Sequence, residues 1–97
     1  MRVQNVNNNR NQFIIFYVEN NKQYKIFQSY ASMIIKWENN KIIEIGGDWD
    51  YSRTTSKYRN LLTKSNKKAF EKMLKEEFTF NEETKTYIRN IYSKDKC

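Results

Sequence analysis

Histidine and proline are absent from this sequence of 97 residues, which contains one cysteine, Cys97, and two glycines, Gly46 and Gly47. Without histidine the chain has no side chain whose ordinary pKa suits a general base near neutral pH. A zinc site of cysteine and histidine ligands is excluded for the same reason. A single cysteine rules out a disulfide within the chain and, at the chain end, is a poor nucleophile. We therefore expect neither nucleophilic nor zinc chemistry.

Carboxylates stand in separate pairs. Asp48 and Asp50 flank Trp49 and could bind a divalent metal in a nuclease-like site. A two-metal site would need further carboxylates, and the other pairs, at 76–77 and 82–83, lie far away in the sequence. We therefore expect a protein that is not an enzyme, with no catalytic residues, no cofactor and no bound metal.

Long apolar runs are also missing. No stretch approaches the roughly 20 apolar residues that a membrane-spanning helix needs. The amino end, MRVQNVNNNR, lacks the apolar core of a signal peptide. We expect a cytoplasmic protein with no membrane partner.

The chain is long enough for one hydrophobic core and too short for two. Aromatic residues make up 15% of it, and their large buried area helps a small domain to close its core. Residues 1–11 are polar and rich in asparagine, which predicts a flexible amino-terminal segment. We expect residues 12–97 to form a single α+β domain.

Two similar hairpins are predicted in the first half of the chain. Apolar, β-branched and aromatic residues dominate segments 13–18, 22–30, 32–37 and 41–45. The first two segments, and again the last two, are separated by Glu-Asn-Asn, and asparagine tolerates the positive φ of a tight turn. These patterns predict a four-stranded antiparallel meander.

Helical spacing of apolar residues replaces this pattern from residue 51 onward. It predicts a first helix from about residue 51 onward, capped by Asp50 or Ser52, and a second over about 66–77. A third would be capped by Asn81, or by Thr79 with Glu82. The expected fold is therefore α+β, with the four-stranded antiparallel meander followed by two or three helices. The apolar stripe of the third helix would consist of Tyr87, Ile88, Ile91 and Tyr92.

The net charge of +7 is concentrated in the second half: residues 1–50 carry +1 and residues 51–97 carry +6. Such a field favours nucleic acid, an acidic protein face or an anionic surface as partner. The same pattern is also typical of a solvated surface with no partner. Six cations and no acid lie between Ser52 and Lys68, namely Arg53, Lys57, Arg59, Lys64, Lys67 and Lys68.

The segment DWDYSRTTSKYRN, residues 48–60, combines hydroxyls with cations at a predicted helix start. Free backbone amides, hydroxyls and the Arg53 guanidinium could together bind an anion. Alternatively, the hydroxyls only cap the helix. Lysines around the start of the second helix oppose its dipole, and a bound polyanion would offset that cost. The candidate partner- or nucleic-acid-binding residues are Trp49, Ser52, Arg53, Thr54, Lys57, Arg59, Lys64, Lys67 and Lys68.

Six aromatic residues have two interpretations. If they line an exposed sheet face, they could stack on single-stranded bases. If they are buried, they supply core area that a small domain needs. They are Tyr17, Tyr24, Tyr30, Trp37, Trp49 and Tyr51.

Ser29-Tyr30 and the run Tyr51-Ser52-Arg53-Thr54-Thr55 carry a resemblance over roughly residues 28–63. The chain resembles a family of small uncharacterised proteins of bacteriophages and other mobile elements. Their pattern is Ser-Tyr, a short strand, a hairpin, and Tyr-Ser-x-Thr-Thr-x-x-His leading into a helix. Tyr58 stands where that family has histidine, which puts any role of that histidine in doubt here.

This resemblance implies a setting rather than a chemistry. Small phage proteins without catalytic groups are often antagonists of host defence, such as anti-CRISPR proteins, or accessories of transcription and replication. We therefore expect an inhibitor in the host-cell cytoplasm, monomeric or homodimeric. Its basic surface would bind a defence effector protein or that effector's ribonucleoprotein complex. The alternative is a phage regulatory or accessory protein that binds nucleic acid, RNA included.

Overall fold

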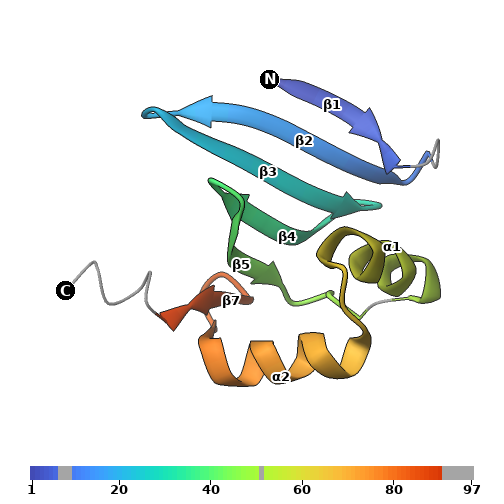
Figure 1. Cartoon of the computed structure of the whole chain (residues 1–97), viewed down its shortest axis with the longest axis vertical. Helices are drawn as coiled ribbons and strands as arrows, with labels where there is room; N and C mark the ends of the chain where they lie inside the picture. The colour runs from blue at the N-terminus through green and yellow to red at the C-terminus, as the bar shows by residue number, and fades with distance from the viewer. Residues whose placement is uncertain (7–9, 51, 91–97) are drawn as a thin grey trace.

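The computed structural model describes residues 1–6, 10–50 and 52–90, which form one antiparallel sheet of seven strands and two helices (Figure 1). The strand order across the sheet is β1-β2-β3-β4-β5-β7-β6. The strands are β1 (Arg2–Asn5), β2 (Gln12–Glu19), β3 (Lys22–Ser29), β4 (Ser32–Glu38), β5 (Lys41–Gly46), β6 (Phe78–Asn81) and β7 (Thr86–Arg89). The helices are α1 (Arg53–Thr63) and α2 (Lys67–Glu77).

The two predicted hairpins are present, and asparagines form their turns. Asn20 and Asn21 have φ of 52° and 65°, and Asn39 and Asn40 have φ of 48° and 69°. Positive φ at both central residues gives the turn twist that matches two antiparallel strands, and asparagine adopts it at little cost. The Glu-Asn-Asn-Lys repeats therefore determine where β2, β3, β4 and β5 end and begin.

The predicted fold class is wrong, because the structure is largely β: within the described residues the sheet has seven strands, and α1 and α2 follow the meander. The predicted third helix is replaced by the β6–β7 hairpin. Asn81 Oδ1 accepts hydrogen bonds from the backbone amides of Glu83 and Thr84, as a helix cap would. Lys85 then has φ of 60°, which turns the chain back. Ile91 and Tyr92, predicted for the same helix, lie outside the described residues, as does Tyr51.

The pairing of β7 explains why this segment forms a strand and not the predicted third helix. Tyr87 pairs with Ile45 of β5, and Ile88 pairs with Glu44. The β5 edge would otherwise carry unpaired backbone amides and carbonyls. Arg89 strengthens this attachment, since its Nε donates to the Ile42 carbonyl at 2.5 Å and its Nη1 lies 2.7 Å from Glu77.

The amino-terminal segment also joins the sheet. Residues Arg2–Asn5 form β1, which pairs with β2. The Arg2 guanidinium lies over the Phe16 ring at 4.4 Å, and Val6 is buried in the core. The polar composition of this segment conceals the strand, because β1 is an edge strand whose four side chains are all exposed.

Both helices pack on one face of the sheet. The buried cluster joins Ile14, Phe27 and Ile45 of the sheet to Tyr58 of α1 and Phe70 of α2. In Figure 1, α2 lies next to β7 at one end of the sheet, and β1 lies at the other end. In the part of the chain that the structure describes, neither helix has the length and apolar character needed to span a membrane.

Gly46 ends β5 against a neighbouring backbone. A Cβ built on it would lie 1.8 Å from the Met33 carbonyl oxygen, a distance that only movement of β4 could relieve. At Gly47 the nearest atom would be the Lys85 carbonyl oxygen, at 2.7 Å. Gly46 is therefore required for close approach of strands, not for an unusual φ.

Gly46→Ala should lower the free energy of unfolding by about 3 kcal/mol or more, because a backbone atom cannot yield as a side chain can. Gly47→Ala should cost less, because its Cβ would lie 2.7 Å from the Lys85 carbonyl oxygen at the β6–β7 turn, a milder overlap than the 1.8 Å contact at Gly46. Urea unfolding of the two variants beside the wild type measures both. Equal losses would show that the contact with Met33 does not constrain β5.

Candidate functional site: the basic helices

The hydroxyls at the start of α1 hold the helix to the sheet. Ser52 is the N-cap, and its Oγ accepts a hydrogen bond from the Thr55 amide at 3.2 Å. Thr55 is fully buried, and its Oγ1 lies 2.7 Å from Ser29 Oγ on β3. Ser56 Oγ donates to Asp50 Oδ1 at 2.9 Å. These bonds favour the capping interpretation of the segment over an anion cradle, with half-buried Thr54 beside them.

Arg59 is a core residue, although sequence reasoning places it on the binding surface. Its exposed fraction is 0%. Its guanidinium lies 5.2 Å from the centre of the Trp49 ring and 5.0 Å from that of Phe70. Nη1 donates to the Trp49 carbonyl at 2.9 Å, and Nη2 donates to Asn60 Oδ1 at 3.0 Å. Arg59 therefore joins α1, α2 and the loop before α1, and it cannot reach a partner.

Trp49 and Trp37 are also packed against neighbouring side chains. Trp49 is partly buried against Phe70, with ring centres 5.3 Å apart. Trp37 is buried under Lys25, whose Nζ lies 4.3 Å from the ring centre. Tyr58 belongs to the same core. None of these three rings presents an open face for a base.

The Asp50 carboxylate is contacted by donor groups of three side chains. Lys67 Nζ lies 2.8 Å from Asp50 Oδ2, and Arg59 Nη1 lies 3.3 Å from Oδ1. The hydrogen bond from Lys67, helped by those from Ser56 and Arg59, holds the pKa of the Asp50 carboxyl below its ordinary value, against the opposing effect of burial. The same contact raises the pKa of Lys67. Lys67 is therefore exposed but already paired.

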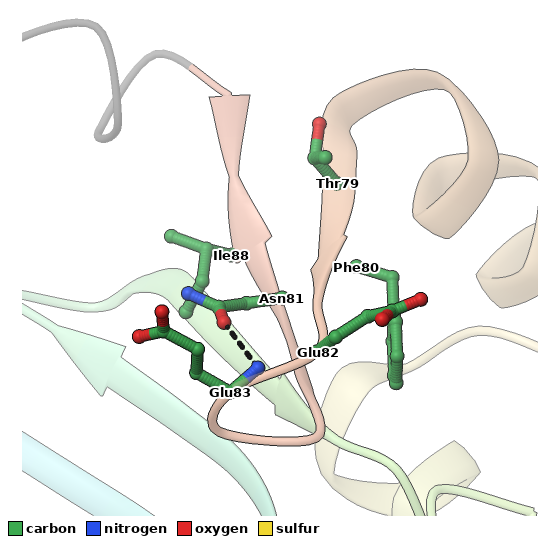
Figure 2. Close-up of a pocket in the computed structure, with 6 residues that line it drawn as sticks. All are labelled: Thr79, Phe80, Asn81, Glu82, Glu83 and Ile88. Carbon is green, nitrogen blue, oxygen red and sulfur yellow. Dashed lines mark hydrogen bonds between the residues drawn. The ribbon is translucent and has the colours of Figure 1, made fainter.

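The acidic pairs do not converge. Asp48 accepts a hydrogen bond from Ser32 Oγ at 2.9 Å, away from the Asp50 network. Figure 2 shows the Glu82 and Glu83 side chains, in a pocket at the β6–β7 turn, with their carboxylates pointing to opposite sides. Among residues 1–6, 10–50 and 52–90, no three acidic, cysteine or histidine side chains gather as metal ligands would.

The remaining cations of α1 form one exposed stripe. Arg53 and Lys57 are four residues apart, so they lie on the same side of the helix, and the exposed Lys64 follows directly after its last residue. Lys64 ends the helix in the left-handed conformation, with φ of 58°. Leu61 lies one turn after Lys57 and is 52% exposed. We call Arg53, Lys57 and Lys64 the α1 stripe.

A second stripe, on α2, extends beyond the cations that sequence reasoning selects. Lys68, Lys72 and Lys75 are four and three residues apart and all exposed, and a shallow groove runs beside them. Lys75 lies 3.6 Å from Glu71. Helical spacing from Lys68 was the sequence signal for Lys72 and Lys75. We call Lys68, Lys72 and Lys75 the α2 stripe.

The comparisons with known proteins give a family but no activity. Residues 1–80 match the model of a family of unknown function, DUF8033. The chain belongs to this family. No curated protein and no solved structure matches the DUF8033 chain. The matched residues include both helices, and with them both basic stripes.

Arg59→Lys should lower the free energy of unfolding by about 2 kcal/mol, because an ammonium group cannot make the guanidinium's planar stack or its forked bonds. Arg53→Lys on the exposed side of α1 should change it by no more than about 0.5 kcal/mol. Chemical denaturation compares the two conservative changes. Similar stabilities of both variants would contradict the structural role of Arg59.

Asp50→Asn should reduce the pH dependence of the free energy of unfolding at acid pH. Because the pKa of Asp50 is lowered by folding, its contribution is present above the unfolded-state pKa and is lost as pH falls through the folded one. The gap in unfolding free energy between wild type and variant should therefore narrow between about pH 5 and pH 2. Urea unfolding at several pH values tests this, and a gap that stays constant would argue against it.

Proposed function

We propose that this protein is a non-enzymatic binding protein that inhibits a host defence effector by covering a negatively charged site on it. The α1 stripe is the contact. The observation that carries the proposal is what remains of the candidate cations after Arg59 and Lys67 are removed. Besides Lys68 on α2, three exposed cations remain along α1 and at its C-cap, with no acidic residue in α1.

Leu61 favours a protein partner over a bare polyanion. Its exposed side chain lies beside Lys57 within the α1 stripe. Protein interfaces combine an apolar anchor with a polar, charged rim, and a few central residues carry most of the binding energy. In this arrangement Leu61 would enter an apolar depression, and Arg53, Lys57 and Lys64 would pair with carboxylates around it, or with phosphates of a bound guide RNA.

The mechanism needs no chemistry from the protein itself. Opposite charges accelerate the encounter with the effector. The Ser52 cap and the Thr55 bond to Ser29 hold α1 in one orientation on the sheet, so little ordering is needed on binding. Occlusion then blocks whatever substrate the acidic site normally receives.

The α2 stripe supports a second candidate, a regulatory protein that binds nucleic acid. Lys68, Lys72 and Lys75 add a second row of exposed cations after the α1 stripe. Two such rows could follow the phosphates of a duplex or a folded RNA. This candidate differs from the first in its salt dependence, because each neutralised phosphate adds to the salt dependence of the affinity.

The charge-reversing pair Arg53→Glu and Lys57→Glu should abolish capture of the partner from a host-cell lysate while the fold is retained. The matched control reverses two exposed lysines on hairpins, Lys41→Glu and Lys85→Glu, and should still capture it. Both variants change the net charge equally, so only the place of the charge differs.

Nuclease treatment and Leu61→Asp separate the two candidates. Capture of one protein that survives nuclease and is lost in Leu61→Asp supports the inhibitor. Loss of all capture after nuclease, with a steep fall of duplex affinity on raising salt, supports the nucleic-acid candidate. Unchanged capture by the Arg53 and Lys57 variant would remove the α1 stripe from both.

A further inference from the structure

The sheet face opposite the helices carries an apolar surface of its own. The register places Val3, Ile15 and Ile26 side by side on β1, β2 and β3. Tyr17 pairs with Tyr24 on the same face, one step along the strands. We call this surface the open face. It consists of Val3, Phe13, Ile15, Tyr17, Tyr24, Ile26 and Met33, with Ile88 further across the sheet.

No described element lies on the open face. None of its residues belongs to the buried cluster that the helices share with the sheet, and Val3 is well exposed. Cross-sheet neighbours bury Phe13, Ile15 and Ile26 only in part. Residues 1–6, 10–50 and 52–90 thus provide a layer for one face of the sheet and none for the other.

Strand β2 has the sequence of a strand that is covered on both sides. Its run FIIFYV has six consecutive apolar residues. Ile14 and Phe16 contact the core, so Phe13, Ile15 and Tyr17 point to the open face. An antiparallel strand with one solvated face normally alternates apolar with polar residues. The lack of alternation indicates that a partner covers this face.

The charges on the open face balance one another. Lys36 stands between Ile26 and Glu44 in the row that crosses the sheet. Glu38 lies 3.5 Å from Lys22. The excess positive charge is carried by the α1 and α2 stripes, in the layer on the other side of the sheet. The open face therefore suits a neutral, apolar partner and not a polyanion.

The aromatic residues of the open face are poorly placed to stack on nucleic-acid bases. Tyr17 and Tyr24 stack on each other, with ring centres 5.0 Å apart and planes 17° from parallel. Lys36 Nζ lies 5.1 Å from the centre of the Tyr24 ring. Base-stacking platforms instead combine available aromatic faces with a row of unpaired cations.

We propose that the open face binds a second copy of this chain, so that two sheets pack face to face in a homodimer. Apolar sheet faces pack in this way about 10 Å apart. A copy of the same chain matches the open face in apolar character. Because the basic helices lie behind each sheet, this is the approach that keeps the positive charges of two copies furthest apart.

The dimensions permit such an interface. Seven strands about 4.8 Å apart span roughly 29 Å across the sheet, and strands of four to eight residues are roughly 14 to 27 Å long. A standard interface buries about 800 Å² on each partner. The sheet approaches this area, and most of the apolar residues of the open face lie on its longest strands, β2, β3 and β4.

Sedimentation equilibrium of the full chain, from low micromolar to submillimolar concentration, tests the proposal directly. The wild type should have twice the chain mass at the upper end of this range. Ile26→Lys, at the centre of the open face, should raise the dimer dissociation constant by about 30-fold or more, as loss of a hot-spot side chain does. Val18→Lys is the matched control, because Val18 is on β2 but on the opposite face and is 68% exposed.

Circular dichroism checks that each lysine variant is folded, and Ile15→Lys provides a second variant should Ile26→Lys fail to fold. A wild type that stays monomeric throughout the range would overturn the proposal. So would an Ile26→Lys variant that is folded and still dimeric. A monomer that binds single-stranded DNA and loses it in Ile26→Lys would assign the open face to nucleic acid instead. None of these outcomes depends on the α1 stripe, so failure here leaves the proposed function standing.

Discussion

The buried guanidinium of Arg59 is the interaction on which the arrangement of the helices depends. It lies between Trp49 and Phe70, bonds to the Trp49 carbonyl, and shares Asp50 with Lys67. A buried charge without partners would cost several kcal/mol, so the loop before α1, α1 itself and α2 must keep these positions together. The N-cap bonds of Ser52 and Thr55 then fix α1 against β3.

The internal contacts of Arg59 and Lys67 determine which cations stay available on the surface. With Arg59 and Lys67 engaged, the other cations of the two helices and the α1 C-cap are exposed and form the α1 and α2 stripes. The other side of the sheet is apolar and neutral. The two surfaces would serve different partners: a negatively charged target for the helices and a second copy for the sheet. A homodimer built on the open face would direct its two basic layers outward in opposite directions, which is a bivalent arrangement.

Sequence reasoning succeeded where the local rule and the tertiary outcome agree. The Asn-Asn turns require positive φ wherever they occur, and the structure confirms both hairpins. The first two of the predicted helices are present. It failed at Asn81, because a side chain that accepts two successive amide bonds looks the same at a helix start and at a tight turn. The hairpin forms because β7 pairs with the edge of β5. The local sequence around Asn81 carries no information about that edge.

The amino-acid sequence by itself determined the strand and turn positions of the meander, the amphipathic helices and the concentration of positive charge after residue 51. Only the tertiary structure decided which cations are available. Arg59 and Arg53 look alike in the sequence, yet one is enclosed by two aromatic rings and the other is exposed. The reason is physical: burial depends on contacts between residues far apart in the chain. Phe70 and Trp49 meet Arg59 only when the helices pack, and no spacing within α1 reports their presence.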